Sequence, residues 1–142
     1  MRKFLRAAAS ALCIVLTCAC AVGAYALFHT PVFRGADRYF FSAEASSSLA
    51  CVSSDDPVFG KLLLGRVAGE SAVYTGNRYL QLKEEFGATL LFCERACGVS
   101  NYYLYSPKLK HAVYLNGHAV NLHIAVRGDT TAAGTPLIFG GF

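Results

Sequence analysis

The sequence predicts an α+β protein: a small antiparallel sheet of about four to six strands with one or two helices packed on one face, preceded by an N-terminal hydrophobic helix. Three observations lead to this fold class. The chain begins with a long uncharged segment, it then shows short apolar runs separated by turn residues, and one stretch between those runs has helical periodicity. Runs of strands with few helices are typical of α+β domains.

The N-terminal segment has the features of an export signal. Three of the first six residues are basic, and the 22 residues from Ala7 to Phe28 are uncharged. At 1.5 Å rise per residue this apolar stretch is about 33 Å long, enough to cross a membrane. The Ala24-Tyr25-Ala26 triplet fits cleavage after Ala26, whereas the length fits an uncleaved anchor. We therefore interpret residues 1–28 as a signal peptide or membrane anchor, and expect the rest of the chain to be extracytoplasmic.

The charge balance argues against a nucleic-acid partner. The whole chain carries a formal net charge of +4, but beyond residue 28 it has 10 basic and 9 acidic residues. A protein that binds nucleic acid needs a basic surface to neutralise the phosphates. We therefore expect no nucleic acid as partner, and instead another envelope protein or a component of the cell wall.

The exported part is predicted to contain a tether and one domain. Residues 29–56 include the small and polar stretch "AEASSSLACVSSDD", which is typical of an irregular tether. Residues 57–142 are long enough for a single α+β domain. Pro57 suits the first position of a helix through "PVFGKLLLGRV", although Gly60 weakens that helix and a strand is the alternative.

The middle of the chain predicts a strand, a helix and two further strands. Glu70–Gly76 reads as a strand that ends in a turn. Asn77 can cap a helix that Gly87 ends, with its apolar residues on one side. Two apolar strands follow, at 88–96 and 99–106.

The pair Asn116-Gly117 predicts a two-residue hairpin turn, and this turn sets a register. The facing pairs are then Leu115 with His118, Tyr114 with Ala119, Val113 with Val120, and His111 with Leu122. One face of the hairpin is apolar and suits the core, and the other is mixed. We expect the polar and aromatic members of the mixed face to form a binding surface: Tyr114, Asn121, His123 and Arg127.

The final segment predicts a loop and a closing strand. Gly128 to Thr135 is rich in small and polar residues, as loops are. Pro136 lacks an N–H and therefore belongs at the start or edge of a strand. We expect Leu137 to Phe139 to complete the sheet.

Three of the six cysteines lie outside the apolar segment, namely Cys51, Cys93 and Cys97. Disulfides are permitted outside the cytoplasm. The spacing of Cys93 and Cys97 does not allow a bridge within one extended strand. A disulfide of Cys51 with Cys93 or Cys97 is the bridge we predict, and three reduced thiols are the alternative.

The sequence contains no motif of a known catalytic or cofactor site. It lacks GxSxG, a phosphate-binding loop, HExxH and a dinucleotide fingerprint, so we predict no catalytic residue and no cofactor. The predicted register separates His111, His118 and His123, so we expect no metal site either. Two classes of function stay open: a non-enzymatic binding module of the cell surface or envelope, and an envelope-acting enzyme whose site no motif reveals.

Three short segments, "YLYSPKL", "NLHIAVR" and "GTPLI", resemble the C-terminal signature of the YwmB-like family. The resemblance covers roughly residues 101–142, and the loop at 128–133 is shorter than the family pattern. It implies an exported protein of Gram-positive endospore-forming bacteria, with a TATA-box-binding-protein-like fold in which helices back a curved antiparallel sheet. It implies no known chemistry and no catalytic residue to transfer. For the binding module we expect an envelope or sporulation-related role.

Overall fold

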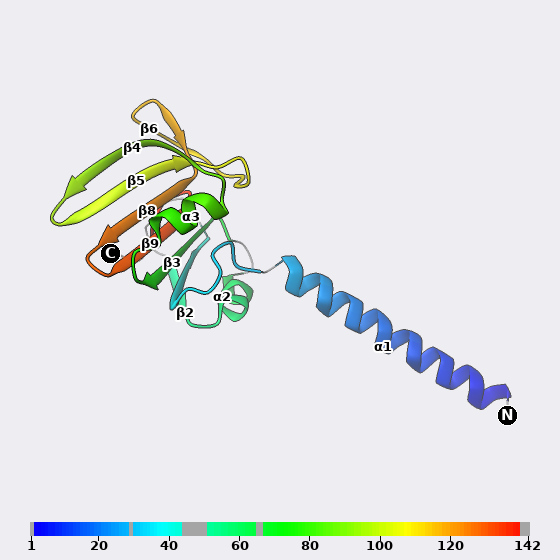
Figure 1. The fold of residues 1–142 in the computed structure, drawn as a ribbon. Coiled ribbons are helices and arrows are strands. Elements are labelled where there is room, and N and C mark those ends of the chain that lie inside the picture. Colours follow the sequence, from blue (N-terminus) through cyan, green and yellow to red (C-terminus); the bar gives the residue numbers. More distant parts are fainter. Residues whose placement is uncertain (1, 29, 44–50, 65–66, 140–142) are drawn as a thin grey trace. The chain divides into compact units, whose positions relative to one another are not determined.

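The computed structural model describes residues 2–28, 30–43, 51–64 and 67–139. The chain divides into two units, Met1–Thr30 and Pro31–Phe142. The first unit contains helix α1, Arg2–Phe28 (Figure 1). Its portion Arg6–Leu27, with a mean hydropathy of 2.2, has the length and composition of a membrane-crossing helix, a property that N-terminal signal sequences share.

The second unit is built on a seven-stranded antiparallel sheet with the strand order β2-β1-β3-β9-β8-β5-β4, beside a separate hairpin of β6 and β7 (Figure 1). Helices α2, Pro57–Leu64, and α3, Tyr79–Glu85, accompany the sheet, so the predicted α+β class is confirmed. The strands are β1 Arg38–Ser42, β2 Cys51–Ser54, β3 Gly69–Thr75, β4 Thr89–Ala96, β5 Val99–Tyr105, β6 Val113–Leu115, β7 His118–Val120, β8 Leu122–Arg127 and β9 Thr130–Thr135.

Helix α3 ends where Gly87 predicts, but its N-cap position is Arg78, one residue after the predicted Asn77, and has no side-chain cap bond. The Asn77 Oδ1 accepts a hydrogen bond from the Tyr79 N–H at 3.1 Å, which satisfies a donor at the helix start. At the other end Gly87 adopts φ +55°, its N–H donates to the Glu84 carbonyl at 3.0 Å, and the next N–H donates to the Lys83 carbonyl at 2.9 Å. This pair of bonds is a Schellman cap, in which glycine avoids the strain of a left-handed backbone.

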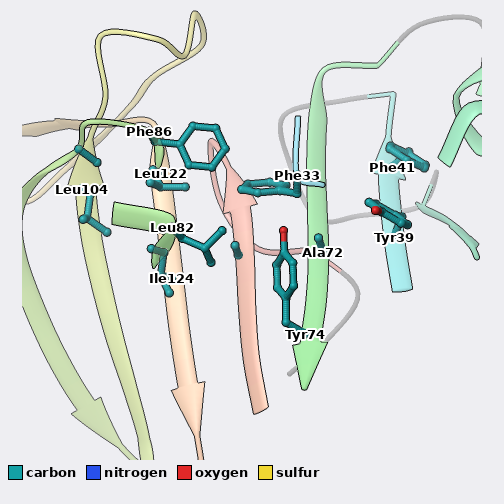
Figure 2. Packing of buried hydrophobic residues seen from close by; sticks show 12 residues of the cluster. Phe33, Tyr39, Phe41, Ala72, Tyr74, Leu82, Phe86, Leu104, Leu122 and Ile124 are labelled. Carbon is teal, nitrogen blue, oxygen red and sulfur yellow. The ribbon is translucent and has the colours of Figure 1, made fainter. Parts of the chain in front are cut away.

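The hydrophobic core lies between one face of the sheet and α3 (Figure 2). Leu82 and Phe86 of α3 are buried, and Tyr79 stacks on Tyr102 of β5 with 4.1 Å between ring centroids. Phe33, which precedes the sheet, meets Phe86 edge to face at 5.5 Å. The members of this cluster from the sheet itself are Tyr39, Phe41, Ala72, Tyr74, Leu104, Leu122, Ile124 and Ala133.

The prediction of an irregular tether at residues 29–56 is wrong for the part that the structure describes. Phe33 is fully buried, and the segment also supplies strands β1 and β2. Tyr39 and Phe41 reach the core from alternate positions of β1, a strand pattern that the small polar residues after them obscured. Residues 29 and 44–50 lie outside the described part of the chain.

The end of the chain also differs from the prediction, because the expected loop contains strand β9. A two-residue turn, with Gly128 at φ +54°, pairs Arg127 with Thr130. Pro136–Phe139 then continues without strand structure and lies against the sheet: Ser71 Oγ donates to the Leu137 carbonyl at 3.3 Å and accepts from the Phe139 N–H at 2.6 Å. Small residues explain β9, since a Cβ at Gly134 would collide with the Leu137 carbonyl.

The predicted hairpin forms with the predicted register over three pairs. Val113 faces Val120, Tyr114 faces Ala119 and Leu115 faces His118, while Asn116 and Gly117 take φ +49° and +77°. The fourth expected pair, His111 with Leu122, is wrong. The chain leaves the hairpin after Val120, and the Asn121 N–H donates to the Leu104 carbonyl of β5 at 3.1 Å. From Leu122 onward the chain belongs to the main sheet.

Candidate functional site

The four residues predicted to share a binding face do not lie on one surface. Tyr114 is 81% exposed on the small hairpin, and Asn121 is buried at the junction with the main sheet. His123 is half-buried in β8, and Arg127 is exposed at the end of that strand. The prediction failed because it extended the hairpin register past Val120, where the chain changes sheets.

Asn121 has a structural role. Its Oδ1 accepts the Ser106 N–H at 2.7 Å, and its Nδ2 donates to the carbonyls of Ser106 at 2.7 Å and Leu109 at 3.0 Å. These bonds close the loop that follows β5. With only 1% of the residue exposed, Asn121 offers nothing to a partner, and its assignment as a binding residue is wrong.

The predicted disulfide is not formed. Cys93 and Cys97 are exposed free thiols, the first on β4 and the second in the turn after it. Cys51 belongs to β2, at the opposite edge of the sheet from β4. Six steps at a strand spacing of about 4.8 Å place these strands about 29 Å apart, and a disulfide requires Cα atoms about 4.4–6.8 Å apart.

A different group of side chains comes together on the face of the sheet opposite α3. Phe92 of β4, Tyr103 of β5 and His123 of β8 are consecutive partners across three neighbouring strands. Their ring centroids are 4.5 Å apart in both pairs, with interplanar angles of 19° and 13°. We call this group the aromatic–histidine row. All three side chains are half-buried, so their ring edges reach the surface.

His123 is neutral at physiological pH. Burial lowers its pKa to about 4. Its Nε2 lies 3.1 Å from Asn101 Oδ1, and the neutral ring donates this hydrogen bond. The histidine therefore acts in the row as a flat aromatic with a fixed polar edge rather than as a cation.

Polar groups border the row. Burial raises the pKa of the Tyr103 phenol, and the nearby Glu94 carboxylate raises it further, so the phenol keeps its proton. His118 of the small hairpin lies next to Phe92, with 5.8 Å between ring centroids. A partner that covers the row would thus meet apolar ring edges beside a carboxylate, an amide and an exposed imidazole.

The row runs out to a sheet edge with which no described strand pairs. β4 is the last strand in the sheet, and most of its residues are exposed. Its pairing with β5 is irregular between Leu90 and Phe92, which shifts the register before the row begins. From Phe92 to Ala96 the ladder is regular, so one edge of this stretch presents free backbone donors and acceptors.

The sequence carried only part of this signal. Phe92 and Tyr103 lie in two strands that the sequence predicts, but their alignment with His123 depends on the pairing of β5 with β8 across the intervening hairpin.

In the described part of the chain, no group of three or more His, Cys, Asp or Glu residues could hold a metal ion.

No family model, no curated protein and no solved structure matches this chain. The fold and the site by themselves define a small α+β domain, following an apolar N-terminal helix, with a half-buried aromatic surface beside an open sheet edge. The function must therefore be inferred from this geometry.

Proposed function

We propose that this chain is a non-enzymatic binding module of the cell envelope that recognises another envelope protein. In this proposal α1 exports the domain, as a signal or an anchor, and the domain acts outside the cytoplasmic membrane. The observation that carries the proposal is the aromatic–histidine row next to the open edge of β4. The resemblance of residues 101–142 to the YwmB-like family supports the same setting and a sporulation-related role.

The surroundings of His123 favour binding over catalysis. A catalytic histidine needs a nucleophile to activate and a group that orients it, often a carboxylate. Among the described residues, His123 instead contacts the amide of Asn101 and stacks on Tyr103. Its lowered pKa also makes it a weak base at neutral pH.

The geometry suits a partner that adds a strand. An extended segment can pair with a free sheet edge, and side chains next to that edge then select its sequence. From Phe92 to Ala96 the edge of β4 is open, and the row lies directly beside it. Half-buried aromatic rings supply contact area at low entropic cost, which is typical of interface hot spots.

Site-specific photocrosslinking in cells tests the site. A photoreactive amino acid at Ala96 of β4 should crosslink to one discrete partner, whereas the same group at Leu80, which is exposed on α3, should not. Tyr103→Leu should reduce the crosslink at least fivefold, and Tyr114→Leu, a matched change on the small hairpin, should leave it intact. Equal crosslinking from both positions, or an unchanged yield in Tyr103→Leu, would refute the proposed surface.

A topology fusion tests the export that the proposal requires. Alkaline phosphatase folds into an active enzyme only in an oxidising compartment, so a fusion after residue 142 should be active in bacterial cells. Replacing Val15 and Leu16 of α1 with Asp should abolish that activity without reducing the amount of fusion protein. An inactive parent fusion that accumulates in the cytoplasm would overturn the extracytoplasmic location.

A further inference from the structure

A second candidate site lies on the helix side of the sheet, away from the aromatic–histidine row. A cavity of about 170 Å³, partly open to solvent, is lined by the segment before β1, by β3 and by α3. Its lining includes Arg34, Tyr74, Arg78, Gln81 and Glu85, with Leu82 as an apolar wall. A buried water occupies about 30 Å³, so the cavity has room for a ligand of several heavy atoms.

Tyr74 lines this cavity, and its side chain carries a buried hydrogen-bond donor. Only 5% of the residue is exposed, and its hydroxyl has no hydrogen-bond partner among the described residues. The ring rises from β3 with its hydroxyl end directed toward Phe33 (Figure 2). Burial raises the pKa of this phenol well above its ordinary value, so the hydroxyl stays protonated. A buried hydroxyl without an acceptor has lost its bonds to water without compensation, and a ligand oxygen would supply the missing acceptor.

Two guanidinium groups give the cavity a positive charge. Arg78 Nη1 donates to Gln81 Oε1 at 2.6 Å, and that bond holds the side chain over the first turn of α3. The other N–H groups of the guanidinium are then available to donate to a ligand. Arg34, from the segment before β1, also lines the cavity. With Glu85 as the acidic member, the formal charges of the lining sum to +1, which a monoanion would balance.

We propose that this cavity binds a small carboxylate, with the Tyr74 hydroxyl and the guanidinium groups of Arg34 and Arg78 as its donors. Arginine forms a planar fork that matches the two oxygens of a carboxylate. A phosphate dianion would leave excess negative charge beside Glu85. The site is independent of the proposed partner surface, because Tyr74 and α3 lie on the other face of the sheet from Phe92, Tyr103 and His123.

Titration of the full-length chain in detergent micelles tests this inference. The probes are sodium propionate, glycine and inorganic phosphate, and the readout is the backbone amide shifts of Gly35 and Gln81, which line the cavity. Propionate should give saturable shifts at both amides. Arg34→Gln and Tyr74→Phe should each weaken propionate binding at least tenfold, and Arg38→Gln, a matched change on β1 outside the cavity, should leave it within twofold.

The melting temperature shows whether Tyr74→Phe has only lost a hydrogen-bond donor or has also lost its fold. Tyr74→Phe removes a hydroxyl that has no hydrogen-bond partner among the described residues, so its melting temperature without ligand should equal or exceed that of the parent. Glycine binding as tightly as propionate would place its ammonium near Glu85 and would still support a carboxylate site. Phosphate binding more tightly than propionate, no saturable shift with propionate, or unchanged binding in Tyr74→Phe would overturn the proposal.

Discussion

Replacing Lys61 with Met tests the buried ion pair that joins α2 to β3. Lys61 Nζ lies 2.6 Å from Glu70 Oε2, and the two side chains are only 9% and 2% exposed. The other carboxylate oxygen of Glu70 accepts the Phe33 N–H at 3.1 Å. Methionine retains the length and apolar packing of the lysine stem, so the substitution mainly removes the charge that faces Glu70.

The expected loss depends on pH. Removing one partner of a buried pair costs about 3–5 kcal/mol, out of about 5–15 kcal/mol for a whole domain. Burial raises the pKa of Glu70, and Lys61 opposes this rise, so the pKa in the folded variant is higher still. When the folded pKa exceeds the unfolded one, stability is greatest below the unfolded pKa and falls as pH rises through the folded pKa. Each pH unit between the two values removes about 1.4 kcal/mol.

Urea unfolding of the full-length chain in micelles provides the assay. The chain has 8 tyrosines and no tryptophan, so near-ultraviolet circular dichroism of the tyrosines reports the folded domain. Lys61→Met should lose about 3–5 kcal/mol at pH 8 and clearly less at pH 5, because the raised pKa of Glu70 favours its uncharged form as pH falls. The control Lys110→Met, at an exposed position, should stay within about 0.5 kcal/mol of the parent. Parent-like stability of Lys61→Met at both pH values would refute the reasoning.

Two further predictions concern a pair of glycines and the histidine of the row. Gly117→Ala should lose about 1 kcal/mol in urea unfolding, because φ is +77° although the space for a Cβ is open. Gly134→Ala should lose more, because its Cβ meets the Leu137 backbone. Equal losses would contradict the packing of residues 136–139 on the sheet. His123 has a folded pKa lowered to about 4, so its stabilising contribution is complete above pH 6.5 and is lost as pH falls toward 4, by up to about 3 kcal/mol. Phenylalanine does not titrate, so His123→Phe should lose less unfolding free energy than the parent between pH 7.5 and pH 4.5. An identical acid-induced loss in both proteins would show that His123 is not buried as described.

Local signals in the sequence were sufficient wherever a few neighbouring residues determine the structure. Gly87 ends α3 because its own φ is positive, and Asn116-Gly117 makes a hairpin turn for the same reason. The apolar face of α3 followed from helical periodicity, and Leu82 and Phe86 indeed reach the core. The class of fold could be derived from such signals.

Features that depend on distant pairing could not be derived in this way. β9 has no strong strand-forming pattern of its own, and it forms because Ala132, Ala133 and Gly134 fit between β3 and β8. Asn121 looked like a surface residue because nothing in its neighbourhood shows that its amide would satisfy the loop at Ser106 and Leu109. The two candidate sites also depend on distant pairing and could not be predicted from local sequence. The aromatic–histidine row needs three strands in register, and the Tyr74 cavity needs three separate segments of the chain.

The position of β9 governs the order in which the sheet can be completed. Strands β1 to β3 can pair among themselves, as can β4, β5 and β8, but in the described sheet these two groups are joined only through β9. Until residues 130–135 are in place, β3 and β8 are both open edges, with Ala72 and Ile124 exposed on the side that later forms the core. A chain that crosses a membrane from its N-terminal end would present these two unmatched halves first. Their exposed edges are the surfaces that a folding helper outside the membrane would have to shield from aggregation.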